Sequence, residues 1–90
     1  MDLQKLKIKS RELEPTVIVG KNGLTEGTIE QIKSVLKKKK LIKIKLLRSF
    51  VAEEEDSGLS KRQVGEKLAE LTNSILVDVV GFTISLAKKF

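Results

Sequence analysis

The stretch from Val17 to Gly27 constrains the fold of this chain more than any other. It opens with the β-branched run Val17-Ile18-Val19, which favours a strand covered by other elements. The tetrapeptide Gly20-Lys21-Asn22-Gly23 follows, and its two glycines free the backbone for a tight turn. Thr25 is then well placed to cap the N-terminus of a helix. These residues predict a buried strand, a tight turn and the start of a helix in direct succession.

The turn in this stretch also carries the first functional signal. A helix N-terminus beside a glycine loop collects unpaired N–H groups, and such groups attract phosphate. The loop does not continue into Gly-Lys-Ser/Thr, so it is not a nucleotide-binding P-loop, and it lacks the dinucleotide-binding fingerprint. We therefore interpret Gly20, Lys21, Asn22 and Gly23 as a clamp for the phosphate backbone of a polymer, with the cation of Lys21 at its tip.

The remaining first half of the chain predicts two helices and a second strand. Residues 1–14 form a short basic amphipathic helix that Pro15 stops, with the apolar stripe Leu3, Leu6 and Leu13. Residues 25–38 form a second helix whose apolar face is Ile29, Ile32, Val35 and Leu36. Residues 41–47 alternate as a half-buried strand does, with Ile42, Ile44 and Leu46 on one face.

The second half predicts a loop, a helix and a hairpin. Residues 48–60 contain the acidic run from Glu53 to Asp56 and are interpreted as a loop. Ser60 and Gln63 form a capping box, so a third helix runs to about Thr72 with Val64, Leu68 and Leu71 in the core. Residues 75–80 and 82–87 are two strands separated by Gly81, which indicates a tight hairpin.

This order of elements, α-β-α-β-α-β-β, defines the fold class. It predicts an α/β two-layer sandwich on a four-stranded mixed sheet, formed as one domain over residues 1–90. Helices should cover one face of the sheet while water reaches part of the other. The first two crossover connections should be right-handed.

Composition restricts the classes of function. The chain has 90 residues, a formal net charge of +6, and neither cysteine nor histidine, which argues against disulfides, zinc fingers and imidazole catalysis. No apolar stretch approaches the roughly 20 residues needed to span a bilayer. We expect a cytoplasmic monomer with polyanionic partners, no cofactor, no metal site and no small-molecule substrate.

Two sets of acidic residues are candidates for catalytic groups, and neither has a pattern typical of an active site. The carboxylates from Glu53 to Asp56 are contiguous and cannot all converge on one reacting atom, so they indicate a solvated charged run. Asp78 lies within an apolar strand and is interpreted as a polar residue with satisfied partners on the open face of the sheet. The sequence therefore predicts a protein that is not an enzyme.

Structured RNA is the polyanion that the sequence favours. Tryptophan and tyrosine are absent, and Phe82 is interpreted as a core residue, so base stacking is not expected to dominate affinity. Contacts with the RNA backbone should dominate instead. The candidate residues are the loop together with basic side chains of the first two helices: Gly20, Lys21, Asn22, Gly23, Lys5, Lys9, Arg11, Lys33, Lys37 and Lys38.

The block from Pro15 to Gly27 resembles the CRM domain family, named for chloroplast RNA splicing and ribosome maturation, in its stand-alone YhbY-like form. The predicted element order resembles that family along the whole chain. The resemblance implies a fold similar to the C-terminal domain of bacterial translation initiation factor three and binding to structured RNA through residues 20–23. It also implies association with precursors of the large ribosomal subunit.

Two alternatives remain beside RNA binding. The basic face could dock on an acidic protein partner in a ribosomal or RNA-processing complex. Peripheral membrane association through the first helix is disfavoured, because its apolar stripe is narrow and it has no aromatic anchors.

Overall fold

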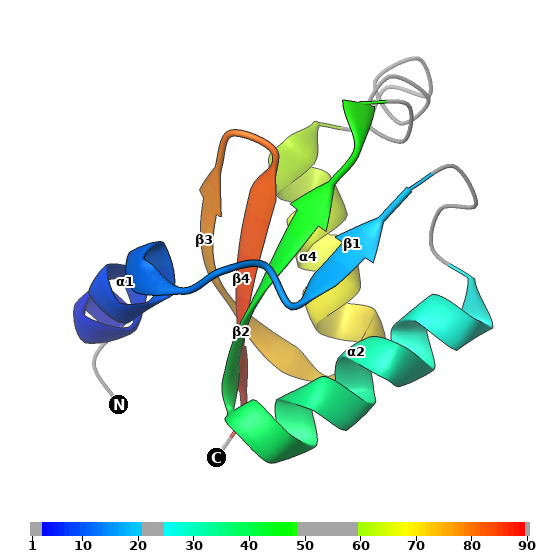
Figure 1. Ribbon diagram of the computed structural model, residues 1–90, viewed down its shortest axis with the longest axis horizontal. Coiled ribbons are helices and arrows are strands. Elements are labelled where there is room, and N and C mark those ends of the chain that lie inside the picture. Colours follow the sequence, from blue (N-terminus) through cyan, green and yellow to red (C-terminus); the bar gives the residue numbers. More distant parts are fainter. Residues whose placement is uncertain (1–2, 21–24, 49–59, 90) are drawn as a thin grey trace.

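The computed structural model describes residues 3–20, 25–48 and 60–89, and these form a mixed sheet with helices packed against it (Figure 1). The elements, labelled as in Figure 1, are α1 (Leu3–Glu12), β1 (Val17–Val19), α2 (Glu26–Lys39), β2 (Leu41–Leu46), α4 (Lys61–Leu71), β3 (Ser74–Val80) and β4 (Thr83–Lys88). The sheet has four strands in the order β1-β2-β4-β3. The predicted fold class is confirmed.

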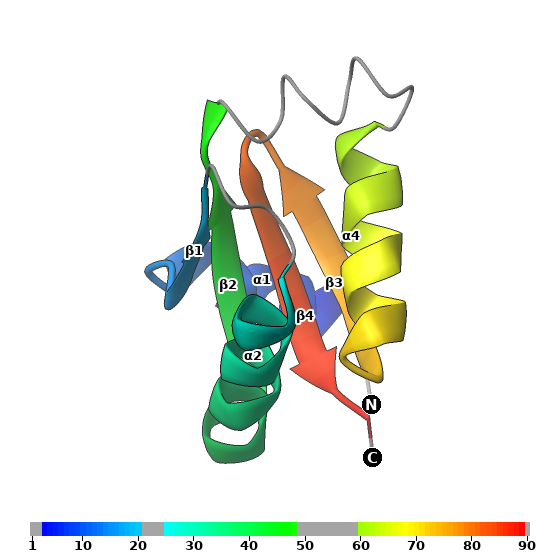
Figure 2. The ribbon, with the colours of Figure 1, turned by 90° about the vertical axis from the view of Figure 1, so that its right-hand side faces the viewer.

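Strand pairing explains how the mixed sheet is assembled. Strand β1 pairs with β2 in parallel, whereas β4 is antiparallel to both β2 and β3. Strands β2 and β3 are therefore parallel to each other with β4 between them. Both crossover helices, α2 and α4, lie against the same face of the sheet in Figure 2, with the right-handed sense that the sequence analysis predicted.

The core fills the space between this face and the two helices. In β2 the residues alternate as predicted, with Ile42, Ile44 and Leu46 buried. Helix α2 contributes Ile32 and Leu36, with Ile29 and Val35 packed at the margin. Burying apolar side chains of this size stabilises a fold by roughly 1.5–3 kcal/mol each.

Local hydrogen bonds set the ends of the crossover helices where the sequence indicated. Thr25 is the N-cap of α2, and its side chain accepts a hydrogen bond from the Thr28 amide at 3.2 Å. Ser60 and Gln63 form the predicted capping box of α4. The acidic run from Glu53 to Asp56 lies outside the described residues.

Helix α1 lies on the opposite face of the sheet from α2 and α4 (Figures 1 and 2). Its buried residue is Ser10, which is 1% exposed and donates a hydrogen bond to the Lys7 carbonyl at 2.8 Å. On this side β4 carries the small residues Ser85 and Ala87, both buried. The prediction that the helices cover a single face is therefore wrong for α1, but beyond α1 this face is open to water as predicted, since Ile18 is 61% exposed.

An irregularity in β3 decides which way Asp78 points. The register with β4 shifts between Leu76 and Asp78, so Val77 is an extra residue in β3. Leu76 and Val79 consequently share the face toward α4, where both approach Gly65. Asp78 faces α1 instead, whereas regular alternation would have placed its carboxylate beside Leu76 against the core. The prediction of a polar residue with satisfied partners on the open face is wrong, because the buried Oδ2 atom has no hydrogen-bond partner among the described residues.

Two predicted core residues lie elsewhere. Leu71, expected in the core stripe of α4, is 44% exposed, because Thr72 takes the buried position at the end of the helix and is 6% exposed. Phe82, interpreted as core, is 37% exposed because it lies with Gly81 in the turn that joins β3 to β4. Gly81 has a φ of +56°, the left-handed conformation that this tight hairpin turn requires.

Candidate nucleic-acid interface

The described part of the glycine loop begins at the end of β1. Gly20 lies beside Leu47, and a Cβ atom added to Gly20 would come within 2.8 Å of the Leu47 Cδ1 atom. The Leu47 amide donates to the Val19 carbonyl at 2.9 Å, so parallel pairing holds the chain up to the loop. The other loop residues proposed as contacts, Lys21, Asn22 and Gly23, lie outside the described residues.

Helix α2 begins shortly after the loop, with Thr25 as its cap. The first amides of a helix carry about half a positive charge and favour an anion. Glu26 already places a carboxylate in that first turn. The helix terminus alone is therefore a weak attraction for phosphate, and nearby cations are needed to make this end of the sheet favourable for a polyanion.

Three residues that the sequence analysis did not select lie at the same end of the sheet. Arg48 follows β2, Lys61 opens α4, and both approach the ring of Phe82 in the β3–β4 turn, with charge-to-centroid distances of 6.0 and 4.7 Å. The Leu46 amide donates to the Phe82 carbonyl at 2.7 Å, which brings the turn beside the end of β2. The sequence signal that could have found Arg48 is its place directly after the strand predicted over residues 41–47, since parallel strands joined by a helix end at the same edge of a sheet.

The α2 cations Lys33, Lys37 and Lys38 lie toward the far end of that helix. Lys37 and Lys38 are exposed in the last part of α2, and Lys33 is about one turn earlier. A helix of 14 residues is about 21 Å long. Lys37 and Lys38 are therefore at the end of the helix opposite the glycine loop, with Lys33 near its middle, and a single phosphate group cannot contact both the loop and these two lysines.

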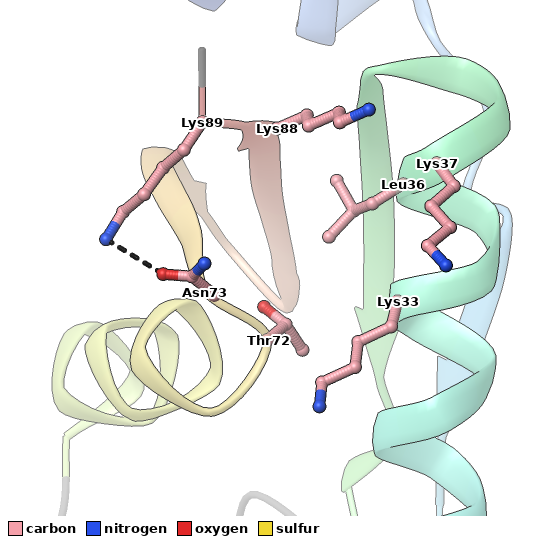
Figure 3. Close-up of a pocket in the computed structure, with 7 residues that line it drawn as sticks. All are labelled: Lys33, Leu36, Lys37, Thr72, Asn73, Lys88 and Lys89. Atoms are coloured by element: carbon pink, nitrogen blue, oxygen red, sulfur yellow. Dashed lines mark hydrogen bonds between the residues drawn. The ribbon is translucent and has the colours of Figure 1, made fainter.

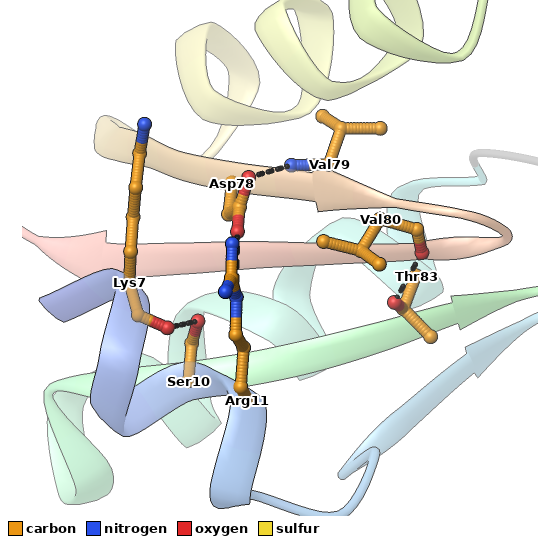
Figure 4. A network of polar contacts seen from close by, with 7 residues as sticks. All are labelled: Lys7, Ser10, Arg11, Asp78, Val79, Val80 and Thr83. Carbon is orange, nitrogen blue, oxygen red and sulfur yellow. Dashed lines mark hydrogen bonds and ion pairs between the residues drawn. The ribbon is translucent and has the colours of Figure 1, made fainter. Parts of the chain in front are cut away.

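The α1 cations occupy the other side of the sheet. Lys5 and Lys9 are exposed on α1, which the sheet separates from α2 (Figure 2). Arg11 has a partner within the fold, because its Nε atom lies 3.7 Å from Asp78 Oδ2 (Figure 4). The structure thus divides the seven predicted contact residues that it describes among the end of β1, helix α2 and the α1 face.

A hollow of about 340 Å³ gathers four lysines at the α2 end of the molecule (Figure 3). Lys33 and Lys37 come from α2, while Lys88 and Lys89 come from the end of β4. The sequence analysis did not select Lys88 or Lys89. Their sequence signal is weak, since the two lysines become part of a site only through the pairing of β4 with β2.

Within residues 3–20, 25–48 and 60–89, no group of three or more acidic or metal-binding side chains is positioned to hold a metal ion. The same described ranges contain no helix long and apolar enough to cross a membrane.

The sequence matches the profile of the CRS1/YhbY (CRM) domain over residues 1–88. The chain belongs to the CRM domain family. Among CRM relatives, a probable RNA-binding protein of Methanocaldococcus jannaschii is 37% identical over 81 residues, covering 90% of this chain and 56% of its own length. The chain thus spans little more than half of that relative.

Two further proteins are similar over more of their own length. The probable RNA-binding protein YqeI of Bacillus subtilis is 37% identical over 84 residues, which cover 93% of this chain and 80% of YqeI. The solution structure of a hypothetical Staphylococcus aureus protein, whose title proposes RNA binding, superposes with a TM-score of 0.74 at 27% identity. The superposition covers 98% of this chain and 84% of the other, so the CRM fold extends over the described elements.

Proposed function

We propose that this CRM domain binds the phosphate backbone of structured RNA and catalyses no reaction. The observation that carries the proposal is the position of Gly20, which lies beside Leu47 where β1 ends and is followed by the capped start of α2. The cation Arg48 directly follows Leu47 in the chain. Two relatives are named probable RNA-binding proteins, which supports RNA as the polyanion.

The mechanism is electrostatic attraction followed by positioning. The net charge of +6 attracts a polyanion, and displacement of counterions from the phosphates supplies affinity that falls as salt rises. The Gly20–Gly23 loop then lets the backbone come close to one phosphate, while Lys21 supplies a cation at the tip. Contacts of this kind fix the position of the RNA without reading its sequence.

Large-subunit ribosomal RNA is the RNA class that we propose, on the basis of the resemblance to YhbY-like proteins. We further propose that the protein acts in the cytoplasm as a monomeric single domain.

The proposal is tested by fluorescence anisotropy with a labelled stem-loop from large-subunit ribosomal RNA, measured across a range of salt concentrations. The wild type should bind with an affinity that falls steadily as salt rises. Lys21→Ala should weaken binding severalfold and reduce the salt slope by about one, because one phosphate contact is lost.

Gly23→Val tests the backbone part of the same contact. It should weaken binding at least as much as Lys21→Ala does, because a branched side chain would hold the phosphate away from the loop. Circular dichroism and thermal melting serve as the control for folding. Unchanged affinity in a folded Gly23→Val protein, or wild-type binding that ignores salt, would contradict the proposed function.

A further inference from the structure

The lysine hollow at the C-terminal end of α2 is built from three segments that are distant in sequence. Lys33 and Lys37 lie one turn apart on α2, Thr72 and Asn73 connect α4 to β3, and Lys88 and Lys89 end β4. The Lys88 amide donates to the Lys40 carbonyl at 2.7 Å, so the end of β4 is held against the end of α2. The hollow is therefore a product of the folded sheet.

The positions of the hollow's side chains favour an anion. Figure 3 shows the Lys33 and Lys37 side chains along the α2 side and Lys88 extending toward α2 from β4. Lys89 Nζ is 3.3 Å from Asn73 Oδ1, which tethers this lysine near the rim. Among the described lining residues there is no carboxylate.

Two nearby negative charges reduce the attraction of the hollow for an anion. Glu30 Oε1 lies 3.7 Å from Lys33 Nζ and offsets part of that cation. The C-terminal end of a helix carries about half a negative charge, which repels an anion. Lys37 and Lys88 have no carboxylate partner among the described ion pairs. Their two full charges exceed the partial charge of the helix terminus, so the net charge around the hollow remains positive.

The hollow is large enough to admit a phosphate group. Its volume of about 340 Å³ is roughly ten times the share of one water molecule in the liquid. Thr72, buried at its edge, has its hydroxyl engaged, donating to the Leu68 carbonyl at 2.7 Å. Recognition in the hollow therefore falls to the ammonium groups, which bind phosphate as point charges.

We propose that this hollow is a second phosphate site, which holds the RNA backbone at the end of α2 opposite the glycine loop. The inference rests on the proposed function and extends it, since it assigns Lys88 to the interface and separates two anchoring points by about the length of α2. An RNA strand gripped at both points would lie along α2, and its orientation would be set by the helix.

The first test compares two charge-matched double variants. Lys37→Gln/Lys88→Gln removes the least compensated cations of the hollow, and Lys45→Gln/Lys67→Gln removes two exposed lysines elsewhere. With the labelled ribosomal stem-loop, the hollow variant should bind about tenfold more weakly with a salt slope smaller by one to two. The control variant should lose no more than about twofold.

The second test uses inorganic phosphate and separates this inference from RNA binding as a whole. In an NMR titration at constant ionic strength, with chloride as the reference anion, phosphate should shift the backbone amide signals of Thr72, Asn73 and Lys88 in the wild type. It should not shift them in Lys37→Gln/Lys88→Gln. Equal losses of RNA affinity in the two double variants would overturn the second site while leaving the proposed function standing. Absence of RNA binding by the wild type would overturn the proposed function itself.

A competitor checks the class of ligand. A short poly-glutamate peptide should displace the stem-loop from the wild type far less effectively than unlabelled RNA does. Displacement at equal concentrations would show that the hollow accepts carboxylates as readily as phosphates, and would overturn the assignment to RNA.

Discussion

Arg11 is a basic residue on the surface that also contacts the interior of the fold. Its Nε atom lies 3.7 Å from Asp78 Oδ2, and Arg11 remains 68% exposed while the Asp78 side chain is 16% exposed. Asp78 Oδ1 accepts a hydrogen bond from the Val79 amide at 3.0 Å, but the buried Oδ2 atom has no hydrogen-bond partner among the described residues (Figure 4). Arg11 therefore compensates a carboxylate that has little access to water, and so helps to hold α1 on the sheet.

Removing Arg11 should accordingly reduce stability. We expect Arg11→Ala to lower the free energy of unfolding by about 1 kcal/mol, since Asp78 keeps its burial and loses its counter-charge. Asp78→Asn should recover part of this loss when combined with Arg11→Ala, because the neutral amide needs no cation. Urea unfolding of the two single variants and the double variant gives the coupling energy.

Arg62 provides the matched control at this scale. Its Nε atom is also 3.7 Å from a carboxylate, Glu66 Oε1, but both side chains are well exposed, at 75% and 60%. An exposed pair of this kind contributes little, so Arg62→Ala should cost less than about 0.5 kcal/mol. Equal losses in the free energy of unfolding for Arg11→Ala and Arg62→Ala would mean that the burial of Asp78 does not strengthen the ion pair with Arg11.

At the scale of elements, the approach of α4 to the sheet depends on Gly65. A Cβ atom added there would come within 3.0 Å of Leu76 Cδ1 and 3.3 Å of Val79 Cγ2. Both partners lie on the α4 face of β3 because of the bulge at Val77. The glycine and the bulge thus act together, one allowing close packing and the other presenting apolar side chains to it.

Gly65→Val should therefore destabilise the protein by about 1–3 kcal/mol, since the added atoms force α4 away from β3. Gly27→Ala is the control, because among the described residues an added Cβ at Gly27 would meet only Thr25 Oγ1, at 3.8 Å. That change should stabilise the protein by up to about 1 kcal/mol through helix propensity. Urea unfolding with unchanged m values checks both, and a neutral Gly65→Val would refute the packing argument.

At the scale of the whole molecule, the sheet separates two basic surfaces. Lys5 and Lys9 belong to the α1 face, whereas Lys37 and Lys38 belong to the end of α2 on the opposite face (Figure 2). RNA either stays on the α2 side, where the loop and the lysine hollow lie, or wraps around the edge of the sheet to reach α1. The second phosphate site favours the first arrangement.

Two double variants distinguish these arrangements at equal charge. Lys5→Gln/Lys9→Gln and Lys37→Gln/Lys38→Gln each lower the formal net charge of +6 by two. We expect the α2 pair to weaken binding of the stem-loop severalfold more than the α1 pair, because long-range attraction falls equally in both and only the α2 pair loses contacts. A larger loss from the α1 pair would place the RNA on the other face.

The sequence by itself determined the features that depend on neighbouring residues. These features are the helix caps at Thr25 and Ser60, the alternation in β2 and the tight β3–β4 hairpin. Each arises from hydrogen bonds or periodicities within a few positions, which can be read directly from the sequence. The class of fold followed from the order of these elements, whereas the CRM family was indicated by the resemblance of the block from Pro15 to Gly27 and is shown by the profile match over residues 1–88.

Tertiary structure alone decided the features that depend on residues distant along the chain. The packing of α1 on the far face, the bulge that turns Asp78 toward Arg11, and the meeting of Lys88 with Lys33 and Lys37 each require contacts between separate elements. No local pattern encodes them, because the side of a sheet on which a helix packs is set by how the burial of all elements is satisfied together. The glycine loop could thus be found from the sequence, whereas the lysine hollow existed only once the sheet had formed.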